Sequence, residues 1–140
     1  MSPDQAREEL QRRADAIEGG YELMLAYAAQ GLVSDQGAAN SSQLRDHLQR
    51  FDAALTGLAE VYRDAATALE VGPKEALEGL LKTLDADATF TQSALRLALA
   101  QPGISSQLVD NINASIHVRA LLTDVFVIDE LLRGTSQGGT

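Results

Sequence analysis

Apolar residues recur at alternating steps of four and three along several stretches of this chain. The longest such series is Leu44, Leu48, Phe51, Leu55, Leu58, Tyr62, Ala65 and Leu69. Because an α-helix turns once in about 3.6 residues, this spacing places the whole series on one side of a helix. An apolar stripe that repeats about every 3.5 residues is typical of helices packed nearly parallel to one another. The pattern therefore predicts an all-α protein built from long helices.

Two further stretches repeat this pattern, one after the middle of the chain and one near its N-terminus. Their members are Leu77, Leu81, Leu84, Ala88, Thr91, Leu95 and Ala98 in the later stretch, and Leu10, Ala14, Ile17, Tyr21, Met24 and Ala28 in the earlier one. The composition agrees, since 45% of the residues are hydrophobic but only 4% are aromatic. Leucine and alanine must therefore fill the core, which suits closely packed helices better than sheets.

Capping and helix-breaking residues divide the chain into four helices. Ser2 precedes a first-turn proline and is a typical N-cap, while Gly31 is a typical residue just beyond a helix end. Gly72 and Pro73 end one helix and begin the next, and Ser105 caps the last. The predicted helices cover residues 3–30, 42–71, 73–101 and 106–133.

These boundaries predict one domain, residues 1–133, folded as an antiparallel up-down-up-down four-helix bundle. Short connections place consecutive helices side by side in opposite directions. A chain of 140 residues is long enough for one core and short for two. The glycine-rich tail, residues 134–140, is predicted to be disordered.

Two adjacent glycines, Gly19 and Gly20, interrupt the first apolar series. Glycine inside a helix costs about 1 kcal/mol relative to alanine. Either the pair marks a bend or a close helix crossing, or the helix begins at Tyr21 and the residues before it form an arm. Glu8 and Arg12 are four residues apart, which favours a helix before the glycines.

The second half of the predicted fourth helix is apolar on almost every side. Val127 and Leu131 continue toward its inner face, which packs inside the bundle. The surplus residues on the other side are Leu121, Val125, Ile128 and Leu132. Since such a helix must be covered nearly all round, we expect these four to contact a second copy of the chain or to be buried beneath the 31–40 loop.

The charge and the N-terminal sequence restrict the partners. Acidic residues outnumber basic ones by 20 to 11, so the net charge of −9 repels nucleic acid and anionic membranes. The charged N-terminus does not resemble a secretory signal, and the longest mostly apolar run, residues 23–33, is shorter than the roughly 20 residues that a bilayer requires. A cytoplasmic protein is expected.

Metal and cofactor sites find little support in the sequence. Without cysteine the chain has no thiolate ligand or nucleophile. A di-iron centre in a helical bundle needs Glu-x-x-His, but Leu44 and Ala114 stand three residues before His47 and His117. We expect no cofactor and no catalytic residue.

Two groups of polar residues remain as weaker candidates for a ligand or metal. Asp110, Asn113 and His117 share one side of the predicted fourth helix, where a hydrated polar face is favoured over a metal site. Tyr21, Tyr62 and Thr91 lie on the apolar stripes, where they either line a ligand pocket or make hydrogen bonds that set the helix register.

Three functions are compatible with these patterns. The first is a non-catalytic, self-associating bundle, a homodimer that acts through protein contacts as an adaptor, small chaperone or regulatory subunit. The second is a carrier or sensor that holds a small ligand or metal in the bundle core. The third is histidine phosphotransfer, because such domains are also four-helix bundles. Their phosphoacceptor would correspond to His117 or His47, although neither is followed by the usual lysine and glycine.

Overall fold

The computed structural model describes the backbone of residues 1–138 and the side chains of residues 1–134. Within these residues the chain is all-α, as predicted, and contains no strand. The helices are α1 (Pro3–Ala28), α2 (Ser41–Leu55), α3 (Leu58–Ala68), α4 (Lys74–Leu99), α5 (Ser106–Ala114) and α6 (Ile116–Gly138). The sequence therefore predicted the fold class correctly but merged two pairs of helices.

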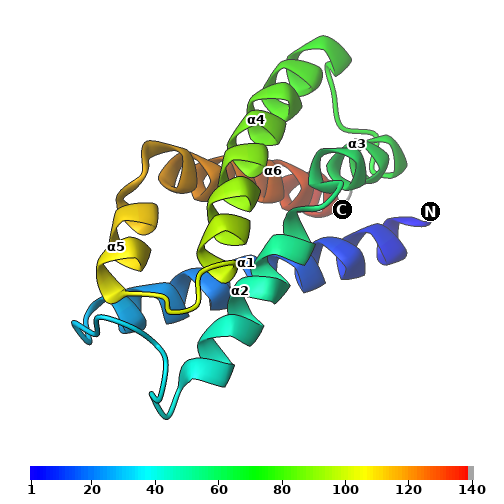
Figure 1. Cartoon of the computed structure of the whole chain (residues 1–140). Helices are drawn as coiled ribbons and strands as arrows, with labels where there is room; N and C mark the ends of the chain where they lie inside the picture. The colour runs from blue at the N-terminus through cyan, green and yellow to red at the C-terminus, as the bar shows by residue number, and fades with distance from the viewer. Residues whose placement is uncertain (139–140) are drawn as a thin grey trace.

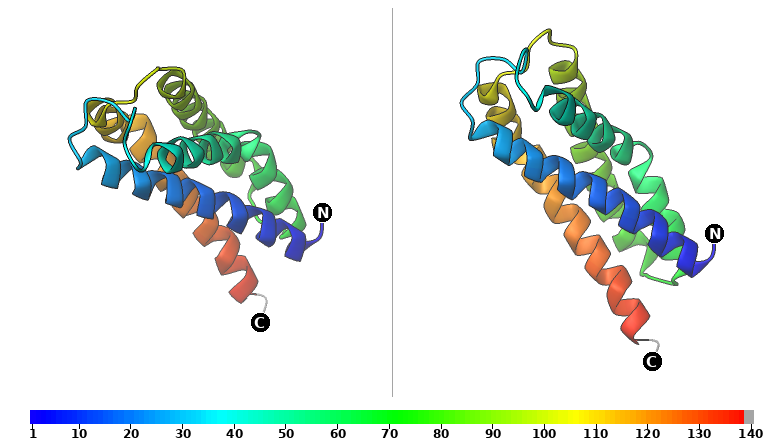
Figure 2. Two further views of the ribbon diagram at one scale, coloured as in Figure 1. Left: turned by 60° about the horizontal axis from the view of Figure 1, so that its bottom comes forward. Right: turned by 90° about the horizontal axis from the view of Figure 1, so that it is seen from below.

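The helices surround one core. Helix α1 packs against α2 and α3 on one side and against α5 on another, while α4 packs against α2, α3 and α6 (Figure 1). Helices α1 and α6 run in opposite directions and diverge toward the two termini (Figure 2). The apolar stripes form the core: every member of the longest series is buried, with at most 7% of each residue exposed.

The predicted second helix, 42–71, is broken at Thr56 and Gly57. Gly57 has a left-handed backbone with φ of 66°, which ends α2 at Leu55 and starts α3 at Leu58. The apolar spacing continues across the break, so the pattern alone did not reveal it. The side chain of Arg13 from α1 donates to the carbonyl groups of Ala54 and Thr56, which satisfies acceptors that the break frees.

The predicted fourth helix, 106–133, is broken at Ser115. This residue adopts an extended ψ of 136°, and its hydroxyl accepts a hydrogen bond of 3.1 Å from the backbone N–H of His117. Serine is a typical residue before a helix, so the signal for a new N-terminus was present in the sequence. Because α6 starts anew after the break, its faces are not in phase with those of α5.

The starts of α1, α2, α4 and α5 lie within one residue of their predicted positions. Ser2 and Gln5 form a reciprocal capping box at the start of α1, and the Ser105 hydroxyl accepts from the N–H of Leu108 at the start of α5. Helix α3 ends before the predicted position, because Glu70 takes a left-handed φ of 57° and closes it. Helix α6 ends at Gly138, so the predicted disordered tail begins inside this helix, and residues 139 and 140 lie outside the described part of the chain.

A close crossing of α1 and α2 explains one of the two central glycines. Helix α1 is continuous through Gly19 and Gly20, so the alternative start at Tyr21 is wrong. A Cβ atom added at Gly20 would lie 2.7 Å from Cδ2 of Phe51, whereas one added at Gly19 would meet nothing within 4 Å. The missing side chain at Gly20 therefore leaves room for the Phe51 ring, whereas no neighbouring atom requires a glycine at position 19.

Replacing each glycine by alanine separates these two roles. Gly20→Ala should lower the free energy of unfolding by about 1–3 kcal/mol, because the new methyl group overlaps the buried ring of Phe51. Gly19→Ala is the matched control and should raise it by about 0.5–1 kcal/mol through helix propensity. Urea unfolding monitored by circular dichroism measures both. Equal effects of the two substitutions would contradict the crossing.

A buried ion pair joins the two longest loops. Asp35 is 1% exposed, and its carboxylate accepts hydrogen bonds from Arg45, from the Ser41 hydroxyl and from the backbone N–H of Ile104, at 2.7 Å in each case. Arg45 also donates to the carbonyl group of Leu99 at 3.1 Å. The Arg45 guanidinium holds the pKa of Asp35 below its usual range. The 29–40 and 100–105 loops are thus fastened to the start of α2.

Candidate functional site

The exposed and buried faces of α6 are the reverse of those predicted. Leu121, Val125, Ile128 and Leu132 are each at most 4% exposed and pack in the core of the chain itself. Val127 and Leu131, assigned to the inner face, are 44% and 49% exposed. The cause is the break at Ser115, since faces drawn through one continuous helix carry the wrong phase beyond it. Any contact of α6 with a second copy would therefore use its exposed residues.

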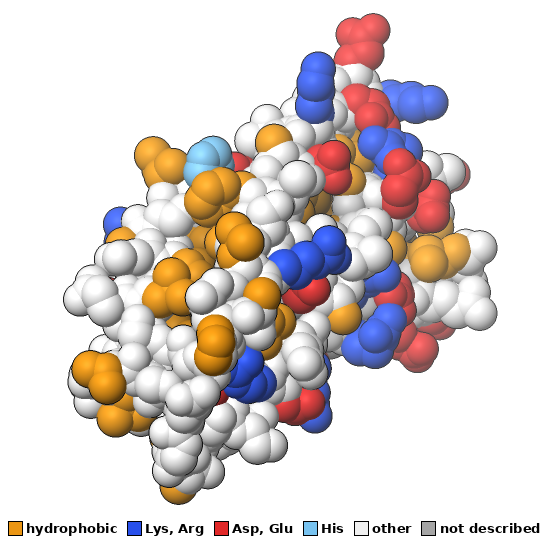
Figure 3. All heavy atoms as spheres, viewed as in Figure 1, with side chains coloured by type: hydrophobic (Ala, Val, Ile, Leu, Met, Phe, Trp, Pro, Cys, Tyr) orange, Lys and Arg blue, Asp and Glu red, His pale blue; other side chains and the backbone are white. Residues whose placement is uncertain are grey.

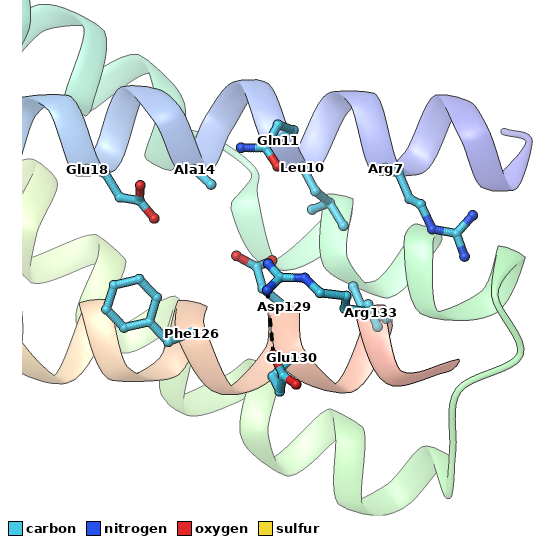
Figure 4. A pocket seen from close by; sticks show the side chains of 10 residues that line it. Arg7, Leu10, Gln11, Ala14, Glu18, Phe126, Asp129, Glu130 and Arg133 are labelled. Carbon is cyan, nitrogen blue, oxygen red and sulfur yellow. Dashed lines mark ion pairs between the residues drawn. The ribbon is translucent and has the colours of Figure 1, made fainter. Parts of the chain in front are cut away.

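A groove with a volume of about 410 Å³ lies between α1 and α6. Figure 4 shows side chains from both helices pointing across it, with Leu10 of α1 facing α6 and Phe126 of α6 facing α1. Helix α1 contributes Arg7, Leu10, Gln11, Ala14 and Glu18, and α6 contributes Phe126, Asp129, Glu130, Leu132 and Arg133. Phe126 is 53% exposed, so a large apolar ring stands open to a partner.

Charges are distributed unevenly along this groove. Arg7 lies near the end formed by the chain termini and Glu18 lies further in, while the Arg133 side chain reaches back toward Asp129 between them (Figure 4). Arg133 forms an exposed ion pair of 3.6 Å with Glu130. Asp129 accepts a hydrogen bond of 2.8 Å from the hydroxyl of Tyr62, and burial raises the pKa of this carboxyl group. The groove thus carries Arg7 at its outer end and Glu18 at its inner end, with Asp129 and Arg133 between them (Figure 4).

A second polar cluster lies between α4 and α6. Asp87 and Asp124 are each 8% exposed, and Asp124 Oδ2 has no hydrogen-bond partner among the described residues. Burial, together with the neighbouring carboxyl group of Asp87, raises the pKa of Asp124 to about 7. His117 Nδ1 is 3.3 Å from Asp87 Oδ1, and the His117 ring stacks on Phe90 with centroids 4.3 Å apart. Burial and the neighbouring carboxyl group therefore favour the protonated form of Asp124.

The polar row predicted on the fourth helix is only partly hydrated. Asp110 is exposed, but Asn113 is 6% exposed and its side-chain amide has no hydrogen-bond partner within the described chain. Asp124 is buried beside Asp87, because the break at Ser115 turns this part of α6 toward α4. His117 is more than one-third exposed and lies beside a carboxyl group, an environment that disfavours a phosphate anion.

The structure separates the remaining candidates. Thr91 is fully buried, and its hydroxyl donates 2.9 Å to the carbonyl group of Asp87, beside the acid pair. Tyr62 is 1% exposed and bonded to Asp129, so it sets the position of α6 rather than facing an open core pocket. Tyr21 is half-buried against the core. The sequence did not single out Asp87 or Phe126, because each is the direct neighbour of a residue on an apolar stripe or in the core. Apolar spacing alone does not resolve which of two neighbouring residues faces the core.

Neither a metal site nor a membrane span emerges from this geometry. Across the part of the chain that is described, no group of three His, Asp or Glu side chains is placed to hold a metal ion. No helix there combines the length and apolar character needed to cross a bilayer. His47, the other histidine, places Nδ1 2.9 Å from the carbonyl oxygen of Gln43 on its own helix.

Comparison with known proteins gives no relative: no family model, no curated protein and no solved structure matches this chain.

The acid pair predicts a characteristic dependence of stability on pH. The pKa of Asp124 in the folded chain, about 7, lies above the roughly 3.9 of an unfolded aspartate. Its protonated form therefore stabilises the fold at low pH, and this contribution is lost as the pH rises through 7. The free energy of unfolding should fall by about 1 kcal/mol from this group between roughly pH 6 and pH 8.

Asp124→Asn should flatten this pH dependence, because the amide stays neutral over the whole range. Asp110→Asn is the matched control, since it removes the same charge from an exposed position on α5. Urea unfolding at a series of pH values measures both variants and the unmodified chain. If the pH dependence of Asp124→Asn matched that of Asp110→Asn, Asp124 would not be the titrating group.

Proposed function

We propose that this chain is a non-catalytic, self-associating helical bundle that acts through protein contacts, with the α1–α6 groove as its contact surface. In this proposal the bundle has four antiparallel members in up-down-up-down order: α1, the α2–α3 pair, α4 and the α5–α6 pair. The pairwise packing supports that order: α1 contacts α2 and α3, α4 contacts α2 and α3, and α6 contacts α4. On the fourth side α5 packs against α1, and only the part between α1 and α6 stays open as a groove.

The observation that carries the proposal is the half-exposed ring of Phe126 in this groove. Burial of a phenylalanine stabilises an interface by about 1.5–3 kcal/mol, and aromatic residues often anchor protein contacts. Leu10 and Ala14 of α1 supply an apolar floor beside it. The side chains of Val127 and Leu131 extend the exposed apolar surface of α6 on a neighbouring side.

The distribution of charge favours a second copy of the chain as the occupant. In a two-fold dimer the same surface meets itself in reverse, so each end of one groove faces the other end of its partner's groove. Arg7 at the outer end would then lie opposite Glu18 at the inner end of the second copy's groove. Such pairing makes the groove self-complementary although the whole chain carries a net charge of −9.

Light scattering with Phe126→Asp tests the proposal. The unmodified chain at tens of micromolar should have the mass of a dimer, and Phe126→Asp should have the mass of a monomer with an unchanged helical spectrum. Leu97→Asp is the matched control, because Leu97 is a 67% exposed apolar residue on α4, away from the groove. It should remain dimeric. A monomeric unmodified chain, or dissociation of both variants alike, would refute the groove as a self-association surface.

One observation favours a second function, the binding of a small organic cation. The groove volume of about 410 Å³ falls within the range of roughly 300–1,000 Å³ common for small-molecule sites. An aromatic ring beside the carboxyl group of Asp129 is a suitable environment for a cation. Native mass spectrometry separates the two functions, since a carrier would show a stoichiometric added mass on the monomer.

A further inference from the structure

A cavity of about 270 Å³ between α1 and α2 has an unusual lining for so acidic a chain. Half of the residues that line it are arginines and the other half are alanines: Arg12, Arg13, Arg50, Ala16, Ala53 and Ala54. The cavity, called here the arginine pocket, thus gathers three of the 11 basic residues of the chain. Short alanine side chains leave the guanidinium groups free to approach a bound molecule.

Arg13 is fixed in place by the fold. Its Nε donates to Glu9, and its Nη1 donates to the carbonyl groups of Ala54 and Thr56 at the break between α2 and α3. The side chain is 17% exposed. Because these bonds occupy Nε and Nη1, the Nη2 group is the part of Arg13 left to bind a ligand, and it is held without further loss of side-chain entropy.

The other two arginines also keep donors for a ligand. Arg12 binds both carboxylate oxygens of Glu9 through Nη2 alone, at 2.6 Å each, and Arg50 pairs with Asp46 through Nη2 at 2.8 Å. Each therefore keeps Nε and Nη1 as donors, which point to different sides of the guanidinium group. Such N–H groups donate charge-assisted hydrogen bonds to the oxygen atoms of a phosphate or carboxylate group.

The electrostatics at this surface already favour an anion. Hydrogen bonds from Arg12 and Arg13 lower the pKa of Glu9 to about 2, so the local field stabilises a negative charge. Three arginines against the two carboxylates of Glu9 and Asp46 leave a local charge of about +1, whereas the whole chain carries −9. A doubly charged oxyanion gains more from such a field than a singly charged one.

We propose that the arginine pocket binds the phosphoryl group of a small phosphorylated molecule. The site is separate from the α1–α6 groove, since the two share no lining residue. Binding would bridge α1 and α2 next to the break at Gly57, so it would stabilise the end of α2.

Isothermal titration calorimetry with pyrophosphate tests the proposal, with sodium chloride at matched ionic strength as the reference. Arg50→Gln should weaken pyrophosphate binding about tenfold, because it removes a charge-assisted contact from one side of the pocket. Arg119→Gln is the matched control: Arg119 is exposed on α6 and its loss changes the net charge equally, so affinity should stay within about twofold. Because Arg50 is 65% exposed, its replacement should leave the fold intact. Circular dichroism checks that both variants are folded.

The possible outcomes are distinguishable. The site is supported if pyrophosphate gives saturable heat, sodium chloride gives none, and only Arg50→Gln reduces the heat. Equal loss in both variants, or no saturable heat for the unmodified chain, overturns it. A parallel sedimentation experiment uses phosphatidylcholine vesicles with and without phosphatidic acid. The unmodified chain could bind the anionic vesicles but not pyrophosphate, and Arg50→Gln could abolish the vesicle binding. That result would assign the pocket to a lipid headgroup and overturn the proposal of a small phosphorylated ligand.

Discussion

The structure depends on the burial of one apolar surface made mostly of leucine and alanine. Each CH₂ group removed from water stabilises the fold by about 0.8 kcal/mol, so the long series of stripe residues supplies the main driving force. Few aromatic rings are available to fill gaps, and the helices must therefore approach closely. Gly20 shows how close: the ring of Phe51 occupies the space where any other residue would carry its Cβ atom.

Polar side chains form hydrogen bonds at the places where the helices are interrupted. Arg13 binds the carbonyl groups freed at the end of α2, and Asp35 gathers donors from Ser41, Arg45 and Ile104. Each of these contacts joins segments far apart in the sequence or closes a loop. They do not drive folding, since a buried ion pair costs desolvation, but they specify which loops meet.

Several side chains do not follow the rule that apolar residues lie inside and charged residues outside, and Figure 3 shows apolar side chains exposed on one face of the molecule. Phe126 stands open in the α1–α6 groove, and Asp124 is buried beside Asp87 with an oxygen atom that lacks a partner. A fold optimised only for stability would avoid both, since exposed rings promote association and a buried carboxyl group without a cationic partner is costly to ionise. These departures mark the surfaces on which self-association and proton binding are proposed.

Sequence periodicity was sufficient for the helical class, the core stripes and most helix ends. Leu44 to Leu69 are buried as the spacing requires, and Ser2 and Ser105 cap helices as expected, because caps and periodicity are local properties. The breaks at Gly57 and Ser115 escaped the pattern, since the apolar spacing continues across the first and serine inside a helix is common enough to overlook.

The phase of α6, and with it the site, was decided by tertiary structure. Once Ser115 separates α5 from α6, packing against α4 selects which side of α6 is buried, and no local pattern carries that information. Leu121 and Val125 therefore lie inside while Phe126 lies open to the groove. The same packing buries Asp124, a residue whose type alone predicts exposure. The sequence by itself determined what each helix could bury; only the packing of the helices determined which side each one did bury.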